Sequence, residues 1–285
     1  MILRKLSLLT LLSVCLSSLS QTSIRLPDII SSGMVLQQQT EVKIWGKATP
    51  GSRISIHTDW TRKDISTEAD ADSTWFLRVT TPKASWHQHV IALRENGNAT
   101  TQVVLSNVLI GEVWFCSGQS NMAFMLRQSA EAQQHIAAAP TKNIRIYDMR
   151  PRVYTDAVAW DSASLAALNR LDYFVPTQWQ ALDEHNASQF SAIAYHFGRM
   201  LADSLGVPVG LICNAVGGAP IESYTSRHTL EYHPTLVDIL TDWRHNDRIQ
   251  PWVRSRASQN IQLSTHPLQR HPYEPCYLYE SGIAP

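Results

Sequence analysis

The stretch that decides the fold reads Gly111-Glu112-Val113-Trp114-Phe115-Cys116-Ser117-Gly118-Gln119-Ser120-Asn121-Met122. Residues 113–116 are apolar, and a helix-like stretch follows Met122. This order predicts a buried strand, a tight turn and a helix that begins near Ser120. Such a turn can present a serine hydroxyl to a ligand while backbone N–H groups face a developing oxyanion. The spelling is not G-x-S-x-G, because Met122 stands where the last glycine would be.

A second glycine-containing turn follows a second apolar run. Residues 207–213 read as a buried strand, and Gly217-Gly218 and Pro220 come shortly after it. Paired glycines allow close backbone approach, and proline suits the first turn of a helix. Open α/β sheets bind ligands just beyond the carboxyl ends of their parallel strands. We therefore expect Ser120 and an N–H group of Gly217 or Gly218 to meet at one carbonyl group of a ligand.

Helical periodicity between these strands indicates an α/β layer. Residues 144–147 read as a third strand, and residues 188–205 as a helix with Ser188 as N-cap and Gly206 as its stop. Runs this apolar are typical of parallel strands buried on both faces. The apolar residues expected on the buried side of the helix are Phe190, Ile193, Ala194, Phe197, Leu201 and Leu205.

The first third of the chain has a different pattern. Short runs, several of them alternating, are separated by turn residues such as Pro50-Gly51 and Asn96-Gly97, which is typical of a small all-β sandwich. The runs expected to be strands are residues 42–45, 53–56, 75–79 and 90–93. We predict a signal peptide over 1–20, a sandwich-like domain over 21–108 and an α/β domain over 109–285, with a helical insertion near 225–262.

Composition excludes some partners. The 285 residues include 24 basic and 24 acidic side chains, so the formal net charge is zero. No excess of positive charge draws the chain to nucleic acid or to an anionic membrane. Arg4 and Lys5 precede an apolar stretch, residues 6–16, that is too short to cross a bilayer. With small residues before Gln21, this pattern predicts a cleaved signal peptide, a secreted or periplasmic protein and no stable membrane insertion.

Three cysteines would remain after that cleavage: Cys116, Cys213 and Cys276. Their wide spacing matches neither a disulfide framework nor a zinc site, so we predict no metal centre from them. Cys116 and Cys213 each end an apolar run, which favours packed core thiols. A bond between these two is possible if their strands are neighbours.

The run over residues 111–122 closely resembles the nucleophile block of the sialate O-acetylesterase family, SGNH-type serine esterases that remove acetyl groups from sugars. Residues 26–38, 190–212 and 214–222 are also similar to the family. The resemblance implies an SGNH-hydrolase-like α/β fold, an O-acetylated sugar or glycan as ligand and no cofactor. It implies that Ser120 is the acyl-accepting nucleophile and that Gly217 or Gly218 helps to form the oxyanion hole. Gln119 and Asn121 would hold the turn in shape.

A serine needs a base to act as a nucleophile near neutral pH, and none of the 11 histidines stands out as that base. His196 falls off the apolar face of its helix. Asp242 and His245 have the spacing of an acid–base pair, but they lie in the expected helical insertion. In the family this pair follows further strands, so we expect a C-terminally truncated member with an incomplete sheet of about three strands.

Other functions stay open at this point. The motifs specify acyl transfer and leave the sugar undefined, so acetylated xylan or another glycan is an alternative substrate. An inactive or sugar-binding remnant, lacking the Asp/His base, is a third possibility of a different class.

Overall fold

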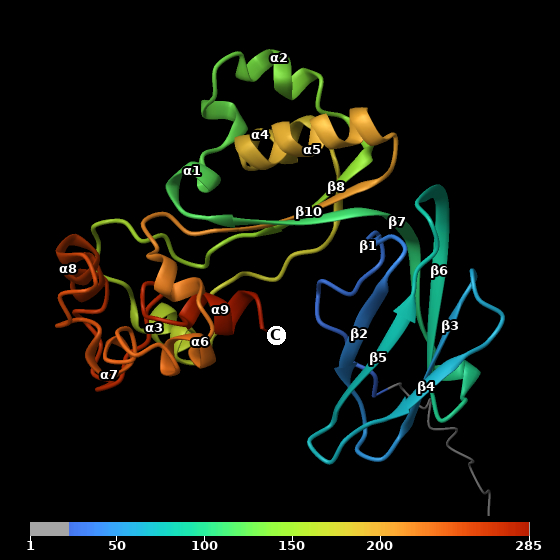
Figure 1. The fold of residues 1–285 in the computed structure, drawn as a ribbon, viewed down its shortest axis with the longest axis horizontal. Helices are drawn as coiled ribbons and strands as arrows, with labels where there is room; N and C mark the ends of the chain where they lie inside the picture. The colour runs from blue at the N-terminus through green and yellow to red at the C-terminus, as the bar shows by residue number, and fades with distance from the viewer. Residues whose placement is uncertain (1–22, 285) are drawn as a thin grey trace, which may run out of the picture.

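The computed structural model describes residues 23–284, so the predicted signal peptide lies outside the described residues. Two regions are joined by one long strand, β7 (Val103–Gly118), which runs from the β-rich region on the right of Figure 1 to the helices on the left. The whole is a mixed sheet with helices, an α/β fold. The predicted domain boundary at residue 108 falls within β7, and the division into domains stays a prediction.

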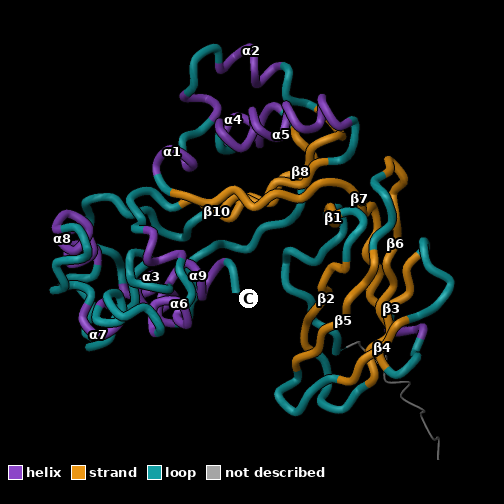
Figure 2. Tube along the Cα trace, viewed as in Figure 1, coloured by secondary structure: helices purple, strands orange, loops and turns teal. Residues whose placement is uncertain are grey.

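Short strands make up the β-rich region, and they are shown in orange in Figure 2. They are β1 (Val35–Gln37), β2 (Glu41–Lys47), β3 (Arg53–Thr58), β4 (Ile65–Glu68), β5 (Thr74–Thr80) and β6 (Ser85–Glu95). Strands β2 and β5 form a two-stranded antiparallel sheet, and β4, β3, β6 and the first half of β7 form an antiparallel series. The four strands predicted here are confirmed as β2, β3, β5 and β6.

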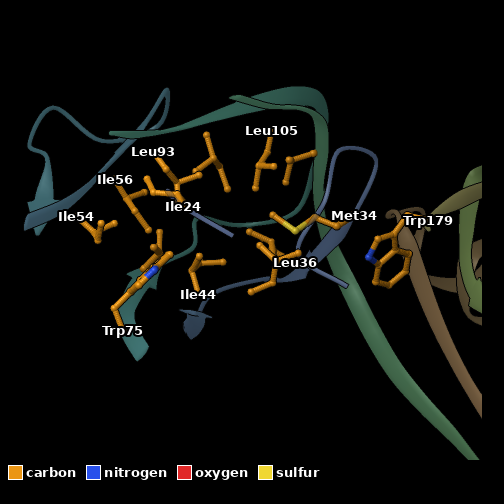
Figure 3. Packing of buried hydrophobic residues seen from close by; sticks show 14 of the residues in the cluster. Ile24, Met34, Leu36, Ile44, Ile54, Ile56, Trp75, Leu93, Leu105 and Trp179 are labelled. Atoms are coloured by element: carbon orange, nitrogen blue, oxygen red, sulfur yellow. The ribbon is translucent and has the colours of Figure 1, made fainter. Parts of the chain in front are cut away.

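Alternating side chains fill the space between these two sheets (Figure 3). Ile54 and Ile56 of β3 are buried while their neighbours face outward, as the two-residue period of a strand requires. Leu93 of β6 and Trp75 of β5 pack into the same cluster. Trp179, from the other region, closes one end of it, and its Nε1–H donates to the carbonyl of Ile29 at 2.8 Å. The two regions therefore share a hydrophobic core.

Three parallel strands form the α/β region, as the sequence predicts. Strand β10 (Val209–Ala215) lies between β7 and β8 (Thr141–Met149) and is parallel to both. The short β9 (Gln180–Leu182) adds an antiparallel edge to β8. The prediction that these strands are buried on both faces is wrong at the end of β7. There Trp114 is 43% exposed and Phe115 is 44% exposed. In the described part of the chain, residues 112–118 of β7 have a strand neighbour on one side only, β10.

Four helices lie on one side of these strands, at the top of Figure 1. They are α1 (Ser120–Ala123), α2 (Ala132–Ala137), α4 (Glu184–Gln189) and α5 (Ala192–Leu205). A 3₁₀ turn, η2 (Leu126–Gln128), links α1 to α2. Within the described residues, no helix is both long and apolar enough to cross a membrane.

The start predicted for the long helix is wrong. Ser188 lies inside α4, and the N-cap of α5 is Ser191, whose Oγ accepts the N–H of Ala194. The chain breaks between the two helices because the carbonyl of Phe190 accepts a hydrogen bond from the backbone of Leu126. Gly206 ends α5 with a left-handed φ of 64°, as predicted.

Two residues of the predicted apolar face point to solvent. Ile193 is 50% exposed and Leu205 is 52% exposed, whereas Phe190 and Ala194 are buried. Phe197 and Leu201 pack against the core as predicted, and small residues at Ala192, Gly198 and Ala202 complete the buried side of the helix. Gly198 packs against Leu211 of β10 so closely that a Cβ atom would overlap that side chain.

A second group of helices gathers beyond the carboxyl ends of the strands. It comprises α3 (Ser162–Asn169), α6 (Arg227–Glu231), α7 (Ile239–Asp242), α8 (Pro251–Asn260), α9 (Tyr277–Gly282) and the 3₁₀ turn η3 (Ile221–Tyr224). The region predicted as a helical insertion contains α6, α7 and α8. Buried aromatic residues, Tyr173, Tyr273 and Tyr277 among them, hold this group together.

The three described cysteines, Cys116, Cys213 and Cys276, are free and buried. Cys116 and Cys213 are direct partners across β7 and β10. They are nevertheless unbonded, so the prediction of packed core thiols is confirmed.

Candidate active site

The predicted strand, turn and helix around Ser120 are all present. Strand β7 ends at Gly118, Gln119 is the N-cap residue, and α1 begins at Ser120. The Ser120 side chain is exposed, and its Oγ donates to Gln119 Oε1 at 3.2 Å. The carbonyl of Gln119 accepts the N–H of Ala123 at 2.8 Å. Gln119 thus contacts both the hydroxyl and the first turn of the helix.

The register of the sheet brings the two glycine-containing turns together. Gly118 of β7 is the direct partner of Ala215 of β10, and the N–H of Val216 donates to the carbonyl of Gly118 at 3.0 Å. Ser120 and Gly217 each follow this pair by two residues. Both therefore emerge from the same edge of the sheet on adjacent strands, as predicted from the sequence.

Tyr224 ties these two strand ends to each other. Its hydroxyl donates to the carbonyl of Gly118 at 2.7 Å and accepts from the N–H of Val216 at 3.2 Å. Burial raises the pKa of Tyr224 well above its ordinary value, so the hydroxyl keeps its proton and can donate at any physiological pH. No sequence pattern indicates this role of Tyr224. The residue lies six positions after Gly218, and its contact with Gly118 forms only in the folded chain.

The Gly217–Gly218 peptide is held in one orientation. The carbonyl of Gly217 accepts from the hydroxyls of Tyr273 and Thr155, both at 2.8 Å. Gly218 has a left-handed φ of 76°, and a Cβ there would overlap the Tyr273 hydroxyl and lie 2.8 Å from the ring of Trp252. In a trans peptide the N–H points opposite to the carbonyl, so the N–H of Gly218 points away from Tyr273.

Within residues 23–284, the N–H groups of Gly217 and Gly218 donate no hydrogen bond. Free donors at the end of a strand are what an oxyanion hole requires. The structure therefore offers these two donors beside the turn that carries Ser120.

A pocket of about 290 Å³ lies at this edge of the sheet. Gly217 lines it, together with Met122 and Ala123 of α1. Ser120, Gln119, Asn121 and Gly218 are not among its lining residues. Polar side chains from residues 148–156 and 189–191 complete the wall: Asp148, Arg150, Thr155, Asp156, Gln189 and Ser191.

Asp148 is a pocket residue that sequence reasoning missed. It lies near the end of β8 and is the direct partner of Cys213. Burial raises the pKa of Asp148, and the guanidinium of Arg150, whose Nε donates to Asp148 Oδ2 at 2.7 Å, opposes that rise. Arg150 Nη1 also donates to Gln189 at 3.1 Å. The signal was available, because a polar residue follows the predicted strand over 144–147 just as Ser120 and Gly217 follow theirs.

The histidines singled out from the sequence do not line the pocket. His196 is exposed on α5, as expected. His245 Nδ1 lies 2.9 Å from Asp242 Oδ1, but the two side chains are 77% and 66% exposed. This surface pair lies at the end of α7, and within residues 23–284 it makes no hydrogen bond or ion pair with Ser120.

No protein-family model matches the chain. Among curated proteins, the sialate O-acetylesterase of Pongo abelii is 31% identical over 218 residues, covering 73% of this chain and 40% of that protein. The sialate O-acetylesterases of Homo sapiens and Mus musculus are 30% and 29% identical, over the same share of this chain. The chain thus spans about 40% of the length of the curated relatives it matches.

A solved structure is also similar. It is described as a novel carbohydrate acetylesterase from Xanthomonas citri, and it matches with a TM-score of 0.60 and 27% identity over 73% of this chain and 43% of that one. Fold and site together place the chain in the class of α/β proteins related to carbohydrate acetylesterases. More particularly, the chain belongs to the sialate O-acetylesterase family.

Proposed function

We propose that this protein hydrolyses acetyl esters of sugars and that Ser120 is its nucleophile. The observation that carries the proposal is the pairing of Gly118 with Ala215, which brings Ser120 and the free N–H groups of Gly217 and Gly218 to one edge of the sheet. The similarity to acetylesterases supports the same chemistry. In this proposal the three parallel strands belong to an SGNH-hydrolase-like sheet.

The proposed reaction has two halves. Ser120 Oγ attacks the acetyl carbonyl carbon, its proton passes to a base, and the carbonyl oxygen becomes an oxyanion. The N–H groups of Ser120 and of Gly217 or Gly218 stabilise that oxyanion, and each such donor contributes about 3 kcal/mol to transition-state stability. The bond to the sugar oxygen then breaks, the sugar leaves with a proton, and water releases acetate from Ser120.

The reaction also requires a general base for the Ser120 hydroxyl, and experiment must identify it. A general base must come within about 2.6–3.2 Å of the serine hydroxyl. In the described residues the hydroxyl of Ser120 donates its hydrogen bond to the Gln119 amide oxygen, which is too weak a base to remove the proton. Serine-dependent turnover by this chain would therefore show that a base reaches Ser120 in solution.

The pocket suits a ligand rich in hydroxyl groups. Its volume of about 290 Å³ is just below the range for drug-sized ligands, about 300–1,000 Å³, so it fits a small ligand such as one sugar residue. Its charged residues are Asp148 and Asp156 against Arg150, so they do not favour an anionic sugar over a neutral one. The choice of sialate as the substrate in our proposal rests on the named relatives, and acetylated xylan or another glycan is the alternative.

The test is acetate release from 9-O-acetylated sialic acid and from acetylxylan, measured for the protein, for Ser120→Ala and for Ser129→Ala. Ser129 lies just after η2 and donates to the carbonyl of Leu126, which makes it a matched control away from the turn. We expect Ser120→Ala to fall to the background rate, as loss of a catalytic serine can lower kcat by about 10⁶-fold. Ser129→Ala should retain activity.

A phosphonate probe for reactive serines supplies an independent readout. We expect it to label Ser120, as located by peptide mass spectrometry. If the protein releases no acetate from either substrate and the probe leaves Ser120 unlabelled, the esterase proposal is contradicted, and the non-catalytic sugar-binding function becomes the better account.

We also propose that the protein is exported, on the strength of Arg4, Lys5 and the apolar residues 6–16. Expression in a secreting host should give a mature chain that begins at Gln21, as read by N-terminal sequencing. A chain that keeps Met1 and stays inside the cell would contradict this.

A further inference from the structure

Three metal-ligating side chains meet in the β-rich region, outside the pocket described above. His87 and His89 belong to β6, and Asp59 directly follows β3. His87 Nε2 lies 3.6 Å from Asp59 Oδ2, and His89 Nδ1 lies 2.7 Å from Asp59 Oδ1. Among the described residues this is the one cluster of three whose ligand atoms lie within 4.8 Å of one another.

The fold orients these groups before any ligand arrives. Asp59 Oδ2 accepts the N–H of Val90 at 3.0 Å, and the backbone N–H of Asp59 donates to the carbonyl of Val90 at 3.3 Å. The carboxylate is therefore held against β6, between the residues that carry the imidazoles. The rings of His87 and His89 lie edge to face with their centroids 4.6 Å apart, and the ring of Trp60 contacts His89 at 5.0 Å.

We propose that Asp59, His87 and His89 bind a divalent first-row transition metal ion such as Zn²⁺. Two imidazoles and one carboxylate are a ligand set that this ion prefers. With metal–ligand bonds of about 2.0–2.1 Å, tetrahedral ligand atoms lie about 3.3 Å apart. The two nitrogen–oxygen separations, 2.7 Å to Asp59 Oδ1 and 3.6 Å to Asp59 Oδ2, fall on either side of that value, and all three ligand atoms lie within 4.8 Å of one another, so modest side-chain movements would complete the site.

Exposure leaves room for a further ligand. The side chain of His87 is 66% exposed and that of Asp59 is 33% exposed, while His89 is 9% exposed. The buried imidazole supplies a rigid ligand, and the two outer groups face solvent. The ion would therefore have three protein ligands and one position open to water.

Binding requires a proton to move on His89. The metal takes the Nδ1 lone pair, so the ring must carry its proton on Nε2 and give up the bond from Nδ1 to Asp59. Within the described residues His89 Nε2 is buried and has no hydrogen-bond partner. The Nε2–H formed in this way is a buried donor without an acceptor among the described residues, so the bond to the metal must offset both the lost bond to Asp59 and the cost of this unpaired donor.

A second histidine–carboxylate pair in the same region provides a matched control. His57 Nδ1 lies 2.8 Å from Asp64 Oδ1, and both side chains are about half exposed, at 47% and 45%. This pair has a similar contact, but among the described residues no third ligand lies close to it. If three converging ligands are what binds the ion, the removal of His57 should have no effect.

The experiment is a zinc titration by isothermal calorimetry, using the full chain with any affinity tag removed, compared with His87→Ala, Asp59→Asn and His57→Ala. We expect one saturable site in the native protein and at least a tenfold loss of affinity in His87→Ala and Asp59→Asn. His57→Ala should stay within twofold of the native affinity. Circular dichroism checks that each variant is folded, which is expected because all three side chains are at least one-third exposed.

Thermal unfolding gives a second readout, because an ion that binds only the folded state raises the melting temperature. Zinc should raise the melting temperature of the native protein and of His57→Ala, and EDTA should reverse that rise. His87→Ala should show no rise at the same zinc concentration. Equal zinc affinity in the native protein and His87→Ala, or an equal loss in His57→Ala, would overturn the proposal.

Discussion

The two halves of β7 have similarly apolar sequences and different surroundings. The first half pairs with β6 over Val103–Ile110 and, near its end, also with β1 over Leu109–Gly111. Val108 and Ile110 are fully buried there, although Val104 near the start of the strand is 46% exposed. From Glu112 to Gly118, its strand neighbour in the described part of the chain is β10 alone, and Trp114 and Phe115 are more than 40% exposed. An apolar run thus predicts a strand, whereas its burial depends on neighbours that come from elsewhere in the chain. The first half anchors the strand, and the second half leads into the turn that carries Ser120.

The largest expected difference between the halves comes from truncating one apolar side chain in each. Ile110 of the first half is fully buried, so Ile110→Ala should cost about 3 kcal/mol of unfolding free energy. Phe115 is 44% exposed, and Phe115→Ala should cost about 1 kcal/mol because roughly half of its surface is removed from water. Urea denaturation measures both, and equal costs would contradict the comparison.

The free energy of unfolding should be nearly as sensitive to a substitution at Gly111, where the two halves meet. A Cβ atom on Gly111 would overlap the backbone carbonyl of Pro208, and backbone cannot move aside as a flexible side chain can. We expect Gly111→Ala to lower the unfolding free energy by about 2–3 kcal/mol, in the upper part of the range for overpacked sites. Gly217→Ala is the control, since its Cβ would meet nothing within 4 Å. A Gly111→Ala variant as stable as Gly217→Ala would contradict the close approach.

Acid should loosen the helices beyond the second half before it affects the β-rich region. Burial lowers the pKa of His271 to about 3, assisted by Arg244, from an unfolded value of 6.5. Between these values the unfolded chain binds a proton that the folded chain does not. Stability is therefore complete above pH 6.5 and falls as the pH drops, by about 1.4 kcal/mol per unit from this group.

Urea denaturation at pH 7, 6 and 5 measures this slope, and hydrogen exchange locates the loosening. His271 Nε2 lies 3.2 Å from Asn260 Oδ1, and its ring stacks on Trp160, so exchange should rise first in α8 and α3. His271→Phe should flatten the slope, and His245→Ala, at an exposed position, should keep it. Unchanged stability down to pH 5 in the native protein would contradict the lowered pKa of His271.

The smallest expected effect concerns the contact that ties the second half to β10. Tyr224→Phe removes the hydroxyl that joins the carbonyl of Gly118 to the N–H of Val216, and we expect a loss of about 1 kcal/mol. Tyr232→Phe is the control, because Tyr232 is 77% exposed. Thermal unfolding compares the two, and a Tyr224→Phe variant indistinguishable from Tyr232→Phe would mean that this hydroxyl does not stabilise the strand ends.

Particular residues show which features of the fold and site could be predicted from the sequence. The strands over 42–45, 53–56, 75–79, 90–93 and 144–147 were predictable because side-chain alternation and apolar runs are local signals. The break at Phe190 was not predictable, because the backbone partner that interrupts the helix, Leu126, lies more than 60 residues away. Asp148 followed a predicted strand and could have been found by the argument used for Ser120. The nucleophile and the glycine donors remain predictions until activity is measured.

By itself, the sequence determined the strand, turn and helix around Ser120. It also determined the strands on which the two glycine-containing motifs end, and the family resemblance. Each of these depends on neighbouring residues along the chain. Only the tertiary structure decided that Gly118 pairs with Ala215, that Tyr224 joins their strands and that Trp114 and Phe115 stay exposed. It also brought Asp59 to His87 and His89 across two strands. These features depend on the register and on which strands become neighbours, and the register follows from the burial of the whole core.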